Sequence, residues 1–325
     1  MSKTRILITD GLAKEGVDIL QAVSEFQVDL RKSTPREELL KIIGGYESII
    51  IRSATTLDAE LVNAAISMKL IVRAGAGVDN IDVPAATSRK IPVMNTASAN
   101  SLAAAEQTIA LMFSMLRMIP QAAQTLREGK WDRESFKGYE ATGKVMGVIG
   151  LGNIGRIVAE KAMGLGMKVV GYDPLVKSLS QLPAYFQKQS EAFKLVGSLD
   201  EVLTLSNLIT VHIPKSKDTA NLINAEKIAK MKDKSFVLNC SRGGIVDEKA
   251  VIAALDSGKL AGAAFDVFEK EPPNFPNALF THPKIVCAPH LGASTFEAQE
   301  RVALTAAQQI VGFFKRGEKA GIINA

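Results

Sequence analysis

The sequence contains few of the residues that mark a secreted or a metal-binding protein. It has two cysteines, Cys240 and Cys287, and three histidines among 325 residues. Neither cysteine stands at a metal-ligand spacing from a histidine, which argues against a zinc site, and we expect no other metal. A disulfide framework would need more cysteines, so we expect reduced, buried thiols and a cytoplasmic location.

Long apolar segments are also absent. Only a short apolar run precedes Thr9 at the N-terminus, which is too little for a secretory signal. The most apolar helical candidate, residues 101–120, contains Glu106, Gln107 and Arg117. A membrane span of about 20 residues would not tolerate these side chains cheaply, so we expect a soluble protein without a membrane partner.

A strong excess of one charge is missing as well. The formal net charge is +5 and the pI is near 9.0, but basic and acidic residues are interspersed along the chain. No basic stripe interleaved with aromatic residues is present, so the sequence does not predict a nucleic-acid partner. The modest excess of lysine and arginine favours an anionic small-molecule ligand.

What the sequence does contain is a repeated alternation of a short β-branched run, a turn and an amphipathic segment. This pattern predicts parallel strands joined by helices, in two series that meet near residue 140. The predicted strands are 5–10, 48–51, 69–75 and 92–95 in the first series and 144–150, 168–173, 208–214, 235–240, 262–267 and 284–290 in the second. Helices are predicted at 35–43, at 101–117 with an end near Pro120, and at 294–317, where Ser294 and Glu297 would form a capping box. The sequence therefore predicts an α/β protein with two doubly wound parallel-sheet lobes and a ligand-binding cleft between them.

A glycine-rich motif opens the second series. It matches G-x-G-x-x-G between a predicted strand and a predicted helix, the context of a dinucleotide-binding turn, whereas the pattern alone would be weak. Gly150 permits a tight turn, Gly152 lets a pyrophosphate approach the backbone, and Gly155 allows the helix to pack closely on the strand. The residues expected to face the cofactor in this turn are Gly150, Gly152, Asn153, Ile154 and Gly155.

The next predicted strand ends on Asp173, eighteen positions after Gly155. A carboxylate there would accept hydrogen bonds from the adenosine ribose hydroxyls. No basic residue follows Asp173 directly, so nothing is offered to a 2′-phosphate. The sequence therefore predicts NAD as the cofactor and not NADP.

Three chemically active side chains follow successive strands of the second series. Arg242 comes after strand 235–240, Glu271 after strand 262–267, and His290 ends the last strand. Each has an ordinary structural explanation: a solvated strand cap, a surface carboxylate before two prolines, and a structural histidine. Their joint placement at one edge of a sheet that also carries a nucleotide turn favours a catalytic site.

Five segments together resemble the D-isomer-specific 2-hydroxyacid dehydrogenases. They are RAGAGVDNID (73–82), GLGNIGR (150–156), NCSRGGIVDE (239–248), GAAFDVFEKEPP (262–273) and PHLGASTFEAQ (289–299). The resemblance covers nearly the whole chain. It implies a Rossmann NAD-binding domain at residues 100–290 and a flavodoxin-like substrate-binding domain formed by residues 1–99 and 291–325.

The resemblance also implies roles. His290 would be the acid/base that exchanges the proton of the substrate hydroxyl, Glu271 would orient the imidazole and stabilise its charged form, and Arg242 would hold the substrate carboxylate. Further cofactor-binding residues would be Ala76, Thr108, Asp173, His212, Ile213, Cys240, Ser241 and Asp266. Substrate-binding residues would be Arg52, Ser53, Arg73, Gly75, Gly77 and Asn100. Arg52 and Arg73 would face a phosphate, with Arg133 as a further candidate.

Within the family the motifs are most similar to the members that oxidise D-3-phosphoglycerate to 3-phosphohydroxypyruvate, the first step of phosphorylated serine synthesis. The implied substrate is a phosphorylated 2-hydroxy acid, and the implied assembly is a homodimer or homotetramer. Many such members carry a C-terminal regulatory domain that these 325 residues lack, so serine feedback through it is not expected. Two alternatives stay open: a glyoxylate or hydroxypyruvate reductase of the same family, and an NAD-sensing interaction protein that resembles the family's corepressors.

Overall fold

A computed structural model describes residues 3–324, and they divide into two compact units. The first unit extends up to Ser101 and resumes at Ala293; the second runs from Leu102 to Gly292. The divisions expected from the sequence, after residues 99 and 290, each lie two residues from these limits.

The first unit is built on a five-stranded sheet in which every paired strand is parallel. Its strands are β1 (Thr4–Ile8), β2 (Phe26–Leu30), β3 (Ser48–Ile51), β4 (Leu70–Arg73) and β5 (Val93–Asn95). Its helices are α1 (Lys14–Gln21), α2 (Arg36–Ile42), the 3-10 turn η1 (Ile43–Gly45), α3 (Ala59–Ala64), α4 (Val83–Ser88) and α13 (Phe296–Arg316). The strand order β2-β1-β3-β4-β5 is the flavodoxin-like order of a doubly wound sheet.

The second unit contains a seven-stranded parallel sheet. Its strands are β6 (Val145–Ile149), β7 (Lys168–Tyr172), β8 (Phe193–Leu195), β9 (Leu208–Val211), β10 (Ser235–Asn239), β11 (Leu260–Phe265) and β12 (Ile285–Cys287). Its helices are α5 (Ser101–Leu116), α6 (Ile119–Arg127), α7 (Asn153–Gly164), η2 (Leu179–Gln181), α8 (Ala184–Gln187), α9 (Leu199–Leu205), α10 (Ala225–Lys230), α11 (Glu248–Asp256) and α12 (Ala278–Thr281). The order β12-β11-β10-β9-β6-β7-β8 is that of a Rossmann sheet with one added strand, and the chain reverses direction across the sheet between β6 and β9.

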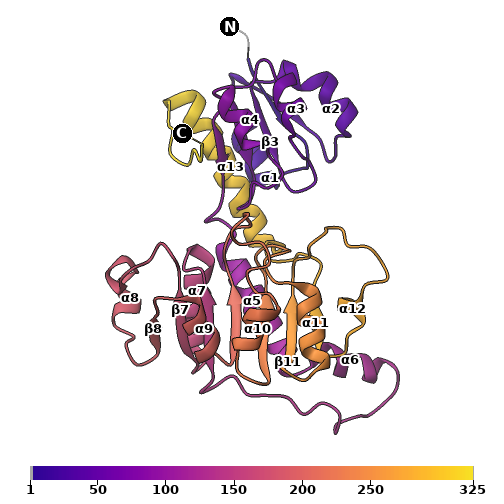
Figure 1. Ribbon diagram of the computed structural model, residues 1–325. Coiled ribbons are helices and arrows are strands. Elements are labelled where there is room, and N and C mark those ends of the chain that lie inside the picture. The colour runs from indigo at the N-terminus through magenta and orange to yellow at the C-terminus, as the bar shows by residue number, and fades with distance from the viewer. Residues whose placement is uncertain (1–2, 325) are drawn as a thin grey trace. The chain divides into compact units, whose positions relative to one another are not determined.

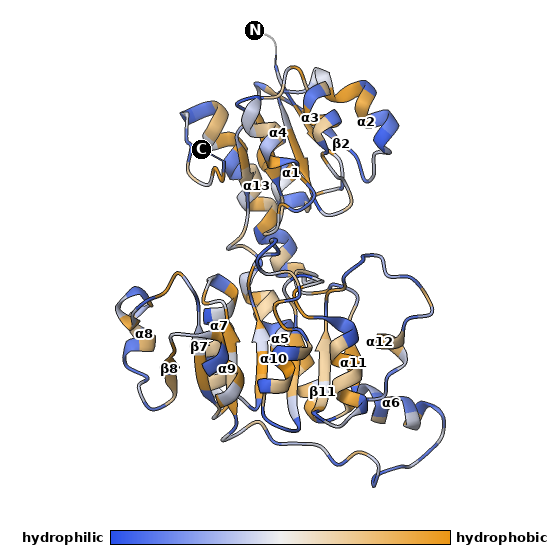
Figure 2. Cartoon of the chain, in the orientation of Figure 1, coloured by the Kyte–Doolittle hydropathy of each residue, from blue (hydrophilic) through white to orange (hydrophobic). Residues whose placement is uncertain are grey.

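Each sheet is apolar on both faces, because helices cover both (Figures 1 and 2). Successive residues of β10 illustrate this: Phe236 and Leu238 belong to one core cluster and Val237 to the other. The first cluster includes residues of α5 and α7, and the second includes residues of α9, α10 and α11. Side chains alternate across a strand, so both halves of the alternation must be apolar, which explains the continuous apolar runs in the sequence.

Four details of the sequence prediction need correction. Strands β2 and β8 were not predicted. Both lie at sheet edges; β2 is half polar, and β8 is only three residues long. Helix α13 begins one residue later than expected: Thr295, not Ser294, is its N-cap and accepts from the backbone of Ala298, so the predicted capping box with Glu297 is wrong. The predicted helix over 101–117 ends at Leu116, and Pro120 lies in the first turn of α6.

Within residues 3–324, no single helix has both the length and the apolar character to cross a membrane. The consecutive helices α5 and α6 meet that criterion only when taken as a pair, which is bent by 64°.

Candidate active site

The glycine turn lies where β6 passes into α7, beside the reversal of strand order. Gly150 has φ +95°, and a side chain there would meet the carbonyl oxygen of His212. A side chain at Gly155 would collide with the carbonyl oxygen of Gly150, so the start of α7 packs directly on the strand end. Gly152 differs, because the space beside it is open for at least 4 Å. The backbone is therefore accessible at the one position where a phosphate has to approach it.

The start of α7 has the features of an anion site. Gly152 is the N-cap of this 12-residue helix and supplies no side-chain cap, which leaves first-turn N–H groups for a ligand. Asn153 and Ile154 form the first turn. Asp173, at the end of β7, is held beside the turn because its Oδ2 accepts from Leu151 N at 2.8 Å. The residues present thus fit a dinucleotide: donors for the pyrophosphate, a carboxylate for the ribose, and no Cβ in the way.

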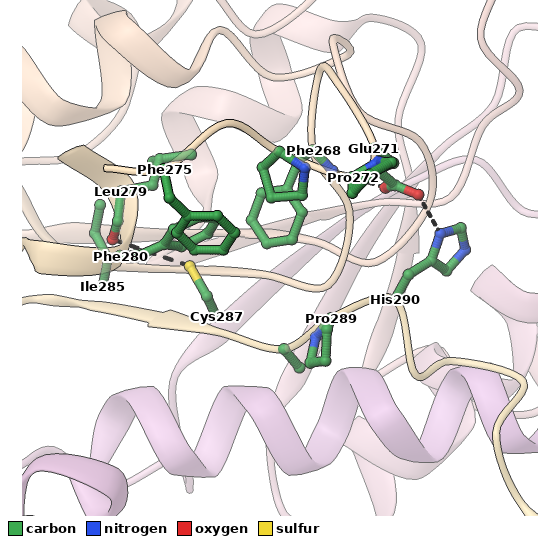
Figure 3. A pocket seen from close by; sticks show the side chains of 12 residues that line it. Phe268, Glu271, Pro272, Phe275, Leu279, Phe280, Ile285, Cys287, Pro289 and His290 are labelled. Atoms are coloured by element: carbon green, nitrogen blue, oxygen red, sulfur yellow. Dashed lines mark hydrogen bonds and ion pairs between the residues drawn. The ribbon is translucent and has the colours of Figure 1, made fainter. Parts of the chain in front are cut away.

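His290 and Glu271 form a direct pair at the other end of the same sheet edge (Figure 3). His290 Nδ1 lies 2.6 Å from Glu271 Oε2, and Glu271 Oε1 accepts from the backbone of Phe268 at 2.9 Å. The carboxylate is thereby fixed in orientation before it meets the imidazole. Because Nδ1 is engaged by Glu271, Nε2 is the nitrogen left to act on a ligand.

The pair lies at one end of a pocket of about 610 Å³ whose other end is aromatic (Figure 3). Its lining residues are Phe268, Glu271, Pro272, Pro273, Phe275, Leu279, Phe280, Ile285, Cys287, Ala288, Pro289 and His290. Burial against this lining raises the pKa of Glu271. The hydrogen bonds from His290 and from the Phe268 backbone lower this pKa, as do the positive charges of His290 and Arg242, and together they exceed the effect of burial. The net pKa lies below the ordinary value, so Glu271 is a carboxylate at neutral pH.

Arg242 contributes to the electrostatics of this pair, which places its charge in the same region. It follows β10, and its Nη1 donates to the carbonyl oxygen of Ser241 at 2.7 Å. Asn239 donates to the carbonyl oxygen of Arg242 and accepts from Ser241 N, which fixes the loop. The structure therefore brings together the three side chains that the sequence predicts at strand ends.

The residues expected to line the cofactor after β9 and β10 lie in the second unit. Ser241 Oγ donates to the carbonyl oxygen of Ile213 at 2.6 Å, which ties the loops after these strands together. Burial lowers the pKa of His212 to about 3, so this imidazole is neutral, with Nε2 3.0 Å from Thr210 Oγ1. Burial raises the pKa of the Cys240 thiol to about 12, and Thr108 is its hydrogen-bond partner. The His212 imidazole and the Cys240 thiol are therefore both uncharged at neutral pH.

The third histidine has partners that the sequence did not reveal. His282 Nε2 lies 3.5 Å from Asp256 Oδ1, and Nδ1 accepts from the backbone of Lys284. The first contact links the end of α11 to the end of α12 and the second is local to the loop after α12, which is a structural role.

Asp266 lies directly after β11 and is fully buried. Its carboxylate accepts from Leu291 N at 2.8 Å, from Gly292 N at 2.7 Å and from Gln107 Nε2 at 3.3 Å. All three donors belong to the second unit. Gln107 was missed at the sequence level, because nothing in the pattern of α5 distinguishes it from a solvated residue.

The expected substrate loops lie in the first unit. Arg52, after β3, is anchored through its backbone: its N–H donates to Asp10 Oδ2 at 2.7 Å, and its carbonyl accepts from Asn80 Nδ2 at 2.7 Å. Arg73 ends β4 and donates from Nη1 to the carbonyl oxygen of Ala74. Its guanidinium lies against Gly75, where any side chain would collide with it.

The neighbouring loop is held in a similar way. The carbonyl oxygen of Ala76 accepts from Asn95 Nδ2 at 2.7 Å. Asn100 is buried, and its Oδ1 has no hydrogen-bond partner among residues 3–324. Ser53 is exposed and Gly77 is partly exposed. Asp10, Asn80 and Asn95, which position these loops, were not anticipated, because their partners are distant in sequence.

Residues 109–292, more than half of the chain, match the family model described as D-isomer specific 2-hydroxyacid dehydrogenase, NAD binding domain. The chain belongs to the D-isomer-specific 2-hydroxyacid dehydrogenases. In this family the matched region is the NAD-binding domain, so NAD is the cofactor that the glycine turn and Asp173 are suited to hold.

Individual relatives and solved structures support the same family assignment. A D-3-phosphoglycerate dehydrogenase of Archaeoglobus fulgidus is 43% identical over 311 residues, which are 96% of this chain and 57% of that protein. The chain spans just over half the length of the curated relatives of this name that it matches. Among solved structures, the TT0316 protein of Thermus thermophilus superposes with a TM-score of 0.88 at 30% identity, covering 98% of this chain and all of that one. A glyoxylate reductase from Paecilomyes thermophila superposes with a TM-score of 0.87 at 29% identity, covering 99% of each. The predicted two-sheet α/β architecture is confirmed.

Proposed function

We propose that this chain catalyses the NAD-dependent oxidation of D-3-phosphoglycerate to 3-phosphohydroxypyruvate, the first step of phosphorylated serine synthesis. The observation that carries the proposal is the 2.6 Å pair of His290 and Glu271 at the sheet edge that also bears the glycine turn. The relatives named D-3-phosphoglycerate dehydrogenase support the choice of substrate.

Each of the three side chains has its own role in this proposed reaction. Bound at the glycine turn, NAD would supply the acceptor for the hydride that leaves carbon 2 of the hydroxy acid. His290 takes the hydroxyl proton on Nε2, because Glu271 holds the Nδ1 proton and stabilises the imidazolium that results. In the reverse direction the same nitrogen returns the proton to the keto oxygen. Arg242 holds the substrate carboxylate and polarises the oxygen on carbon 2.

The substrate phosphate is assigned to Arg52 and Arg73 of the first unit. A guanidinium forms a bidentate, charge-assisted pair with a phosphate and is held rigidly when its backbone is anchored. Arg52 meets that condition through Asp10 and Asn80. Arg133 lies in the exposed segment after α6 and is a further candidate for the phosphate.

The test compares two keto acids that differ only in the phosphate. NADH consumption should be much faster at low concentration of phosphohydroxypyruvate than of hydroxypyruvate, and Arg73→Ala should raise KM for the phosphorylated acid about tenfold or more. Equal losses with both acids would reject a phosphate-binding role for Arg73. Lys69→Ala, which removes an exposed cation from the same segment, is the matched control.

The second candidate is a glyoxylate or hydroxypyruvate reductase; the similarity to the Paecilomyes thermophila enzyme, at 29% identity, supports it less than the relative at 43% identity supports the phosphorylated substrate. It predicts that hydroxypyruvate or glyoxylate is the better substrate and that Arg73→Ala has little effect. An NAD-sensing interaction protein would bind NADH but turn over none of these acids, so the same assay separates all three.

We also propose that the protein forms a homodimer through α6 and the segment that follows it. Four large apolar side chains are exposed there: Ile119 (52%), Leu126 (57%), Trp131 (80%) and Tyr139 (41%). Such a concentration is typical of an interface core, where aromatic residues are enriched. Trp131→Ser should shift the mass measured by light scattering toward the monomer, and an unchanged mass would place the contact elsewhere.

A further inference from the structure

Asp266 is the only acidic side chain that is buried among residues 3–324. A buried carboxylate is costly unless hydrogen bonds satisfy its oxygens. Two of its three donors are Leu291 N and Gly292 N, the backbone amides that directly follow His290. The third is the side chain of Gln107, which reaches Oδ1 from helix α5.

The turn held in this way has an unfavourable backbone. His290 has φ +55°, a conformation that non-glycine residues adopt rarely and that the surroundings have to maintain. On one side, His290 N donates to the carbonyl oxygen of Ala288 at 3.0 Å. On the other side, the next two residues are held by the hydrogen bonds that Leu291 N and Gly292 N donate to Asp266. The position of the imidazole therefore depends on the carboxylate of Asp266.

We propose that Gln107 is a positioning residue: by donating to Asp266, it keeps that carboxylate aligned with the amides of Leu291 and Gly292, and so fixes the turn that presents His290. This role rests on the function proposed above, in which His290 is the acid/base. The proposed role also explains why helix α5, which packs on the sheet, directs the amide of Gln107 toward Asp266.

The electrostatics are consistent with this. Burial raises the pKa of Asp266, and the two amides, the charge of His290 and the hydrogen bond from Gln107 act against the rise. Two titratable groups among residues 3–324 are seen to interact with Asp266: His290, on the turn itself, and the thiol of Cys240, whose pKa of about 12 keeps it neutral. A protonated Asp266 would be a weaker acceptor for the amides, so removal of Gln107 should loosen the turn most at low pH.

Two substitutions at position 107 make opposite predictions. Gln107→Leu removes the donor, so kcat should fall about tenfold at pH 6 and less at pH 8, within the loss of up to 10²-fold expected for a displacement of about 1 Å. Gln107→Glu places a second carboxyl beside Asp266; the two can share one proton at low pH but repel at high pH, so kcat should fall as the pH rises. The KM for substrate and the affinity for NADH should change less than kcat in both variants.

Amide hydrogen exchange of a peptide that contains residues 288–295 gives a direct readout without activity. Protection of this peptide should decrease in Gln107→Leu, more at pH 6 than at pH 8 after correction for intrinsic exchange. Gln187→Leu is the matched control, because Gln187 is an exposed glutamine of the same unit whose bond is to the carbonyl oxygen of Leu182. It should leave both readouts unchanged.

The outcomes separate the two proposals. If the wild-type protein turns over none of the keto acids, the proposed function fails, while the exchange data still test the turn. If the wild type is active and both variants keep its kcat, its pH profile and its exchange pattern, the role of Gln107 is refuted. Parallel pH profiles in the two variants would also refute it, because a merely structural defect does not reverse sign.

Discussion

Replacing Glu271 by glutamine tests how the His290 pair works, because it keeps the shape of the side chain and removes its charge. The 2.6 Å bond is charge-assisted, and such bonds contribute about 1.5–3 kcal/mol. The side chains of His290 and Glu271 are 47% and 35% exposed, so solvent screening puts the value near the lower limit, about 1.5 kcal/mol. Glu271→Gln should therefore lower kcat about tenfold, whereas His290→Gln should lower it by roughly 10²–10⁴.

Steady-state NADH consumption at saturating substrate measures both losses, and quenching of protein fluorescence by NADH verifies that the cofactor still binds. The double variant decides whether Glu271 acts through His290. If it does, Glu271→Gln should cost nothing further once His290 is glutamine, since residues that act as a unit are not additive. Glu269→Gln removes an exposed carboxylate two residues away and should leave kcat unchanged.

Wild-type turnover in Glu271→Gln would refute the reasoning, because the bond at Nδ1 would then have no catalytic consequence. Additive losses in the double variant would show that Glu271 acts on something other than the imidazole.

Two further predictions concern the nucleotide side of the second unit. Asp173→Ala should weaken NAD binding about tenfold and narrow the preference over NADP, since the variant loses the acceptor for the ribose hydroxyls; unchanged selectivity in paired titrations would reject that role. The second concerns pH. The pKa of His212 is about 3 in the folded state, below its ordinary value of 6.5 in the unfolded chain. As the pH falls below 6.5, the unfolded state therefore binds a proton that the folded state does not, and the free energy of unfolding decreases. At pH 5.5 the loss should be about 1 kcal/mol, and urea titrations of His212→Gln between pH 7.5 and 5.5 should show a shallower decline than the wild type. An identical decline would mean that His212 is protonated in the folded protein.

The chemistry of the site was readable from local sequence. A glycine turn of this kind needs three glycines at fixed spacing, because two backbone segments approach closely and a phosphate needs open space beside the remaining glycine. In the structure Gly150 and Gly155 make the close backbone approaches, and the space beside Gly152 is open. Arg242, Glu271 and His290 each follow an apolar strand, and parallel strands deliver their carboxyl ends to one edge. Central strands such as β6 and β10 were predictable, since burial on both faces demands a continuous apolar run.

Tertiary structure alone decided which groups meet and which are shielded from water. Edge strands β2 and β8 escaped prediction, because a strand with one neighbour can be short or half polar. The link from Gln107 to Asp266 spans 159 positions and depends on how α5 packs against the sheet, which no local pattern encodes. The same holds for the charge states: burial, which comes from distant segments, keeps His212 neutral and leaves Asp266 dependent on three donors. Sequence thus determined the reactive groups and their strand ends, while packing determined their partners and their protonation.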